Sequence, residues 1–168
     1  QLRSGHLADT VGRAVAASGI QWRDLEIEVT ESLLVSGSGA ALQQLQALRE
    51  AGATVAIDDF GTGYSSLAYL RRLPLDQLKI DQSFIRNVAQ DSVDAAIVRS
   101  VINVGQSLKI GVVAEGVETQ EQLSFLADEA CDQVQGYLLG KPAPIETYAE
   151  WIGRTKSVSN VSNLPRRV

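Results

Sequence analysis

The sequence is poor in the residues that mark several classes of protein. Its single cysteine, Cys131, excludes an internal disulfide and fits a reducing compartment, and its apolar surroundings favour a packed thiol over a nucleophile. Aromatic residues make up only 5% of the chain and the net charge is −5, which argues against a surface for nucleic-acid polymers. The only histidine, His6, is expected to lie exposed on the first helix, unrelated to any metal.

The sequence shows no signal peptide and no apolar run that approaches the length of a membrane span. We therefore expect a cytoplasmic domain, in a parent protein that a region before Gln1 could tether to a membrane. With 168 residues, of which 45% are hydrophobic, the chain is long enough to form one sizeable core.

Strand-like and helix-like segments alternate along most of the chain, which predicts parallel β/α units. Gly52 closes a helix with leucines on one face, and Thr119–Gln122 forms a capping box at the start of another. Ser65 or Ser66 is expected to cap a helix that must end before Pro74. The expected strands cover residues 25–29, 54–57, 77–80, 110–114 and 134–137. The expected helices lie within residues 4–18, 42–48, 65–73, 91–104, 119–126 and 146–152.

Two architectures fit this alternation, a doubly wound sheet and a (β/α)₈ barrel. Polar residues lie at or near the C-terminal ends of five different strands, which is typical of a barrel mouth rather than of a single switch point. About five strands are too few to close a standard barrel. We therefore expect an α/β fold of TIM-barrel-like units, an incomplete barrel in which residues 1–156 are the C-terminal portion of a larger domain and 157–168 are a disordered tail. The five polar residues are Glu28, Asp58, Lys79, Glu115 and Gln135.

Asp58 and Asp59 end an apolar strand and precede a glycine-rich turn. Paired carboxylates repel one another and are costly to desolvate, and a divalent cation is the commonest compensation. A simple turn with a helix cap is the plainer alternative for this pair. Interpretation of Asp59-Phe60-Gly61 as a kinase motif, or of the glycines as a phosphate-binding loop, fails because the accompanying motifs are absent.

Carboxylates, divalent ions and one lysine at a common rim suit the metal-assisted hydrolysis of a phosphate ester. Glu28, Asp58, Asp59 and Glu115 are candidate metal ligands or bases, and Lys79 could stabilise phosphoryl oxygens or orient the attacking water. Metal ions would also reverse the charge of an acidic mouth, which otherwise repels an anionic substrate.

Five segments resemble the ordered signature blocks of the EAL domain, a family of bacterial phosphodiesterases that linearise cyclic di-GMP to pGpG. The match spans nearly the whole chain except its tail, and the order and spacing of the five blocks argue strongly against a chance match. The blocks are Glu28-Val29-Thr30-Glu31-Ser32, residues 58–67, Leu78-Lys79-Ile80-Asp81, residues 114–119 and Gln135-Gly136-Tyr137.

The resemblance implies a metal centre and a catalytic group. Glu28 and Asp58 match metal ligands and Asp59 matches a residue of the second metal, so the implied cofactor is Mg²⁺ or Mn²⁺, with two ions in the intact domain. Lys79 matches the lysine near the attacking water, and Glu115 matches a carboxylate that serves as general base or in the water-activating network.

Three further positions match the family. Gln135 corresponds to a catalytic-site residue on the last strand. Glu31 corresponds to a residue that holds the loop after Asp59, and this loop links the active site to the dimer interface in relatives. Glu118 lies next to the site without an assigned role, and a favourable contact with the following helix dipole is its plainer explanation.

The departures from the family pattern concern the start of the chain. The Glu-Ala-Leu motif does not occur, and Gln1-Leu2 would be the end of the family's Asn-containing block. We therefore expect an active phosphodiesterase in the intact parent domain, and weak metal binding with little turnover by this chain alone. The implied partners are cyclic di-GMP and upstream sensory or GGDEF-type domains. The open edges and apolar interior expected of a half-barrel favour a homo-oligomer.

Two other functions stay open at this point. The first is a non-catalytic EAL-like receptor that binds cyclic di-GMP and signals through a partner. The second, more remote, is an unrelated barrel enzyme with convergent carboxylates. Retention of the three metal-ligand candidates together with Lys79 and Glu115 favours the hydrolase, because a receptor does not need all five.

Overall fold

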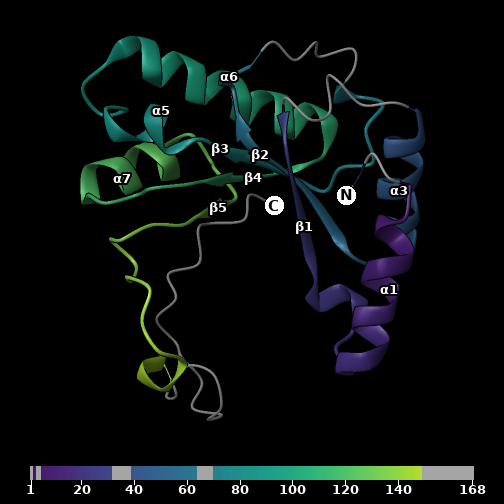
Figure 1. Cartoon of the computed structure of the whole chain (residues 1–168). Helices are drawn as coiled ribbons and strands as arrows, with labels where there is room; N and C mark the ends of the chain where they lie inside the picture. The colour runs from purple at the N-terminus through teal and green to yellow at the C-terminus, as the bar shows by residue number, and fades with distance from the viewer. Residues whose placement is uncertain (1, 3–4, 32–38, 64–69, 149–168) are drawn as a thin grey trace.

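Five parallel strands form a single sheet, in the order β1-β2-β3-β4-β5 (Figure 1). The computed structural model of the chain describes residues 2, 5–31, 39–63 and 70–148. The strands are β1 (Glu26–Thr30), β2 (Thr54–Phe60), β3 (Gln77–Ile80), β4 (Gly111–Ala114) and β5 (Gln133–Val134). The helices are α1 (Leu7–Ser18), α3 (Gly39–Glu50), α5 (Gln82–Arg86), α6 (Ser92–Leu108) and α7 (Gln120–Asp128), with short 3₁₀ turns at η2 (Trp22–Asp24) and η3 (Ile145–Tyr148).

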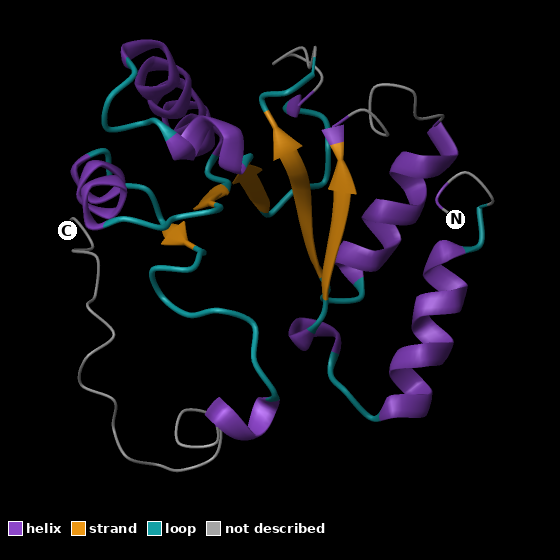
Figure 2. Cartoon of the chain, turned by 60° about the vertical axis from the view of Figure 1, so that its left-hand side comes forward, coloured by secondary structure: helices purple, strands orange, loops and turns teal. Residues whose placement is uncertain are grey.

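The consecutive strand order decides between the two candidate architectures. Crossovers between parallel strands are right-handed, so a sheet that never reverses its order carries its connecting helices on one face. Figures 1 and 2 show the helices around the outside of the sheet, from α1 and α3 at one end to α7 at the other. The expected TIM-barrel-like units are confirmed. In the described part of the chain β1 and β5 are the two ends of the sheet, which is therefore an open, incomplete barrel.

The hydrophobic core lies between the sheet and the helices. Each strand turns alternate residues towards this layer, and the side chains there are almost fully buried. Cys131 belongs to the same layer with 2% exposure, so the expected packed thiol is confirmed, and burial raises its pKa to about 11. The core includes Leu45, Leu48, Val55, Ile57, Leu78, Ile80, Val98, Ile102, Val112 and Leu126.

The other face of the sheet is mainly polar, and the expected apolar interior is wrong. The alternation that places Ile57 and Leu78 in the core turns Asp58 and Lys79 to the opposite side. Ala56 and Val113 are the small apolar exceptions in the middle of this face. The concave side of the open barrel thus carries a charged surface instead of a second core.

Most predicted elements are present, with different ends. The Thr119–Gln122 capping box is confirmed, and Asp91 caps α6. The strand after Ala53 continues to Phe60, whereas the last strand has only two residues. The short α5 and η2 were not expected.

Two predicted caps and two predicted end segments lie wholly or partly outside the described residues. These are the caps at Ser65 and Ser66, the helix at 146–152 beyond Tyr148, and the tail at 157–168. Within the described part of the chain, His6 is exposed, and no helix has the length and apolar character that a membrane crossing requires.

Candidate active site

Lys79 joins two carboxylates at the C-terminal rim of the sheet. It lies on β3 next to the strand end, and its Nζ is 2.5 Å from Oε1 of Glu28 on β1 and 2.6 Å from Oε1 of Glu115 directly after β4. Lys79 is only 6% exposed. Burial alone would lower the pKa of its ammonium group, but the ion pairs with Glu115 and Glu28 outweigh burial and raise it above the ordinary value. Lys79 is therefore a fixed positive charge at neutral pH.

Glu26 lies two residues before Glu28, on the same face of β1. Burial and the neighbouring Glu28 carboxylate raise the pKa of Glu26, despite the opposing charge of Lys79. Glu26 was not among the predicted site residues, although the polar/apolar alternation of β1 places it on the same face as Glu28. The concave face thus places three carboxylates around one buried cation.

A β-bulge gives Asp58 and Asp59 their positions at the end of β2. Ile57 pairs with Leu78 and Phe60 pairs with Ile80, so β2 contains one extra residue over this stretch. Asp59 adopts a left-handed backbone conformation with φ of 54°, and its N–H donates to Oδ1 of Asp58 at 3.0 Å. Consecutive residues of a regular strand would point to opposite faces, and the bulge relaxes that rule at this pair.

Asp81 is a second acidic residue at the rim that was not predicted as a site residue. It follows β3 directly, caps α5 by accepting from the N–H of Ser83, and its carboxyl group lies near that of Asp59. Burial and the neighbouring carboxyl groups of Asp58 and Asp81 raise the pKa of Asp59. Burial alone would also raise the pKa of Asp81, but the hydrogen bonds from Ser83 outweigh burial and lower it. Acidic groups therefore gather at the C-terminal ends of both β2 and β3.

Glu31 holds the start of the loop that follows β2. Its Oε2 accepts the backbone N–H groups of Gly61 at 3.1 Å and Gly63 at 3.2 Å, and the side chain is 3% exposed. A Cβ atom at Gly63 would lie 2.9 Å from the Glu31 carboxyl group, so a side chain at this position would have to displace that group. Glu31 therefore contacts the first residues of this loop, Gly61 and Gly63, through its carboxyl group.

Gln135 and Glu118 lie at the same rim, further along the chain. Gln135 follows β5 and is exposed, with its backbone N–H bonded to the carbonyl of Ala114. Glu118 is exposed in the loop before α7. The ion pairs described for Lys79 are with Glu28 and Glu115. Neither Gln135 nor Glu118 takes part in them.

The chemistry of the rim suits a hard divalent cation, but the described residues form only part of a coordination shell. Carboxylate oxygens are the ligands that Mg²⁺ and Mn²⁺ prefer. In residues 2, 5–31, 39–63 and 70–148, no three acidic, histidine or cysteine side chains are close enough together to hold an ion. The donor types fit a metal, and further ligands would be needed to complete its site.

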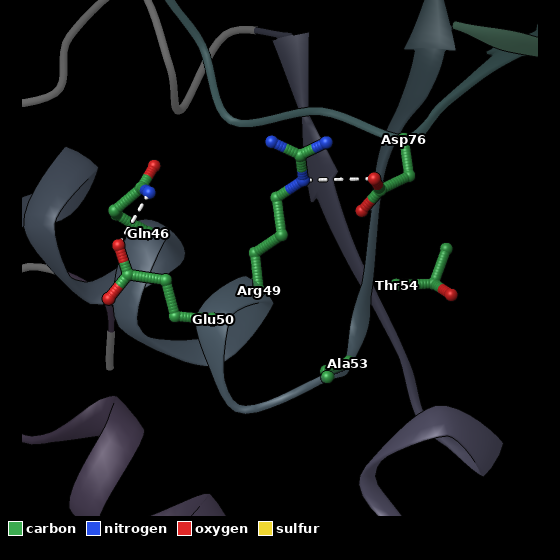
Figure 3. Close-up of a pocket in the computed structure, with 7 residues that line it drawn as sticks. Gln46, Arg49, Glu50, Ala53, Thr54 and Asp76 are labelled. Atoms are coloured by element: carbon green, nitrogen blue, oxygen red, sulfur yellow. Dashed lines mark hydrogen bonds and ion pairs between the residues drawn. The ribbon is translucent and has the colours of Figure 1, made fainter.

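A hollow of about 420 Å³ lies at the opposite end of the sheet (Figure 3). It is lined by the end of α3 and the start of β2, where barrel residues usually serve stability. Its polar side chains bind one another: Arg49 pairs with Asp76 at 2.9 Å, and Gln46 donates to Glu50 at 2.8 Å. This hollow is therefore a less suitable reaction site than the carboxylate rim.

The EAL domain family profile matches residues 1–142 of the chain. The chain belongs to the EAL domain family. Among relatives of this EAL chain, the cyclic di-GMP phosphodiesterase NbdA of Pseudomonas aeruginosa is 47% identical over 146 residues, which are 87% of the chain and 19% of NbdA.

MucR of the same organism, a bifunctional diguanylate cyclase/cyclic di-GMP phosphodiesterase, is 46% identical over 87% of the EAL chain and 21% of MucR. The solved MucR phosphodiesterase in complex with cyclic di-GMP superposes with a TM-score of 0.81 and 46% identity, over 84% of the EAL chain and 57% of that structure.

A manganese and cyclic di-GMP complex of Klebsiella pneumoniae BlrP1 gives a TM-score of 0.75 with 38% identity, over 82% of the EAL chain and 36% of BlrP1. The EAL chain spans about a fifth of the length of the curated relatives that it matches.

Proposed function

We propose that the intact domain containing this chain hydrolyses cyclic di-GMP to linear pGpG with the help of Mg²⁺ or Mn²⁺. The observation that carries the proposal is the Glu28–Lys79–Glu115 arrangement at the rim, beside Asp58 and Asp59. The names of the relatives support the same substrate, since NbdA and MucR are cyclic di-GMP phosphodiesterases.

Each candidate site residue has a distinct role in this proposal. Lys79, protonated at neutral pH, stabilises phosphoryl oxygens or orients the attacking water, and cannot itself be a base. Glu115 accepts a proton from that water, and Gln135 contributes hydrogen bonds from the neighbouring strand end. Glu31 positions the loop after Asp59. Glu118 stays next to the site without a chemical step.

Glu28, Asp58 and Asp59 would hold the metal, with two ions in the intact domain. Bound divalent ions neutralise phosphate charge and lower the pKa of a bound water. Because the described residues supply only part of a coordination shell, we expect weak metal binding and little turnover from the chain alone.

The wider context of the domain is also part of the proposal. Residues 1–156 belong to the domain and 157–168 form a tail. The domain functions in the cytoplasm, as a homo-oligomer, behind a sensory or GGDEF-type region. The diguanylate cyclase activity in the name of MucR supports such an arrangement.

Hydrolysis of cyclic di-GMP by the intact domain with Mn²⁺ or Mg²⁺ tests the proposal, with Glu115→Gln as the variant. The substitution keeps the side chain's size but removes the carboxylate, so kcat should fall about 10²- to 10⁴-fold, the range for loss of a general base. Glu129→Gln is the matched control, because Glu129 also accepts from a cation at 2.6 Å and is similarly exposed, but lies away from the rim beside Arg99.

The control variant should keep the wild-type kcat. If Glu115→Gln also kept it, the role of Glu115 would be wrong. Tight binding of cyclic di-GMP by the wild-type domain without turnover would instead support the receptor function.

A further inference from the structure

Gln122 is a buried polar residue that the proposed chemistry does not use. Three polar or charged side chains are buried in the described part of the chain: Glu31, Lys79 and Gln122. Glu31 holds the loop after β2 and Lys79 forms the centre of the rim. Gln122 is 5% exposed and lies in the first turn of α7. Burial of an amide is favourable only when its hydrogen bonds are made, so its partners indicate its role.

Both ends of the Gln122 carboxamide are engaged. Its Oε1 accepts the backbone N–H groups of Glu118 at 2.7 Å and Thr119 at 2.9 Å, which forms half of the capping box. Its Nε2 donates to the backbone carbonyl of Arg86 at 3.1 Å, at the end of α5. A capping box needs only the acceptor, and glutamate serves it as well as glutamine does. The bond to Arg86 is therefore not needed for the capping box and joins α7 to α5.

The bond to Arg86 connects the two halves of the candidate active site. α5 begins three residues after Lys79, whereas the loop that Gln122 grips begins at Glu115. α5 and α7 lie next to each other at one side of the molecule (Figure 1). Gln122 thus fixes the distance between the elements that follow Lys79 and Glu115.

Two glycines hold the same loop by close backbone contact. A Cβ atom at Gly116 would lie 2.6 Å from Cβ of Gln82 on α5. A Cβ atom at Gly136 would lie 2.2 Å from the backbone of Val117. The loop 115–119 is therefore closely packed between α5 and the segment after β5. Gln122 adds hydrogen bonds to this packing.

We propose that Gln122 is a positioning residue that holds Glu115 in register with Lys79 by tying the loop 115–119 to the end of α5. The proposal rests on the proposed function, in which Glu115 acts on the water. Displacement of a reacting group by about 1 Å can cost on the order of 10²-fold in rate. Loss of the bond from Gln122 to Arg86 should therefore lower kcat while KM changes little.

Two substitutions distinguish the bond from Gln122 to Arg86 from the capping bonds to Glu118 and Thr119. Gln122→Glu keeps an acceptor for Glu118 and Thr119 but loses the donor to Arg86. Gln122→Ala loses both the acceptor and the donor. Because it introduces no buried charge, it replaces the glutamate variant in the test if that variant does not fold. Asp91→Ala is the control, because it removes a comparable N-cap from α6, and the side-chain bonds of Asp91 to Val93 and Asp94 involve neither Gln122 nor the loop 115–119. The loss of this cap should cost about 1 kcal/mol in stability.

The measurements are kcat and KM for cyclic di-GMP in the intact domain, together with hydrogen exchange of single amides. We expect both Gln122 variants to lower kcat at least about tenfold with KM changed less than about threefold, as for an interaction that acts on the transition state. Asp91→Ala should leave both constants unchanged. The amides of Glu118 and Thr119 should exchange faster in Gln122→Ala, and those of Val93 and Asp94 faster in the control.

An unchanged kcat in a folded Gln122 variant, or a loss equal to that of Asp91→Ala, would overturn the proposal, since Gln122 would then serve stability alone. A wild-type domain without phosphodiesterase activity would instead overturn the proposed function. In that case the exchange data still decide the tether: unchanged exchange at Glu118 and Thr119 in Gln122→Ala would show that Gln122 does not hold the loop.

Discussion

At the residue scale, Lys79 shows how the fold restrains a flexible side chain. A lysine carries several rotatable bonds, but burial to 6% exposure and two carboxylates at 2.5 and 2.6 Å leave its ammonium group one position. A buried charge without such partners would cost several kcal/mol. The same restraint that makes Lys79 tolerable in the fold gives the rim a fixed positive charge for an anionic substrate.

Cys131 gives a prediction at the same scale, on pH and stability. Burial raises the pKa of its thiol from 9.0 to about 11. Between these values the unfolded chain releases the thiol proton and the folded chain keeps it, so stability is complete below pH 9 and falls as pH rises towards 11. At pH 10 the loss should be about 1.4 kcal/mol, one pKa unit.

Urea unfolding of the intact domain at pH 8 and pH 10 measures this loss. Cys131→Ala cannot ionise, so the variant should lose less stability over this interval than the wild type, whatever its stability at pH 8. Equal losses in the two proteins would show that the thiol does not contribute.

At the scale of secondary-structure elements, Asp76 fixes the beginning of two strands. It directly precedes β3, and its Oδ2 accepts the backbone N–H of Val55 in β2 at 3.0 Å, while Oδ1 accepts from Arg49 (Figure 3). Asp132 repeats the arrangement before β5, where it accepts from Val112 in β4 at 2.8 Å. These aspartates set the register between neighbouring strands and so the alignment of the rim.

Asp76→Ala should therefore destabilise the domain by roughly 1–3 kcal/mol, because it leaves the N–H of Val55 without its partner. Arg49→Ala removes only the half-exposed ion pair and should cost less than about 1 kcal/mol. Thermal or urea unfolding of both variants gives the comparison. Equal effects would mean that the ion pair, and not the backbone bond, is what matters.

The elements also show why some features followed from the sequence and others did not. β3 agrees with its predicted range, and the capping box before α7 is present, because apolar runs and capping residues are local signals. α5 is too short to show a helical period. The bulge at Asp59 depends on pairing with β3, which no local pattern records.

The residues of the candidate site also fall into two groups, those that local sequence signals predicted and those that depend on the folded arrangement. Glu28, Asp58, Lys79 and Glu115 could be predicted because each is a polar residue at or near the C-terminal end of a predicted strand. Asp81 was missed as a site residue because its place beside Asp59 arises only when β2 and β3 pair. The tether from Gln122 to Arg86 spans 36 residues of sequence and needed the folded arrangement to be seen.

At the scale of the whole molecule, the open sheet predicts association. β1 and β5 end the sheet in the described part of the chain, and strand edges with free backbone groups pair readily with other chains. Because the concave face is charged, we expect backbone pairing at the edges, rather than burial of an apolar face, to drive this association. Light scattering after size exclusion should give dimers or larger species for the chain alone, and a stable monomer would contradict the expectation.

The most direct test of the proposed function compares this chain with the intact domain in the hydrolysis of cyclic di-GMP, at equal concentration with Mn²⁺ and with the product identified. We predict that the intact domain forms linear pGpG, that Glu115→Gln suppresses this product while Glu129→Gln does not, and that the chain alone forms little. An intact, folded domain that forms no pGpG would contradict the account.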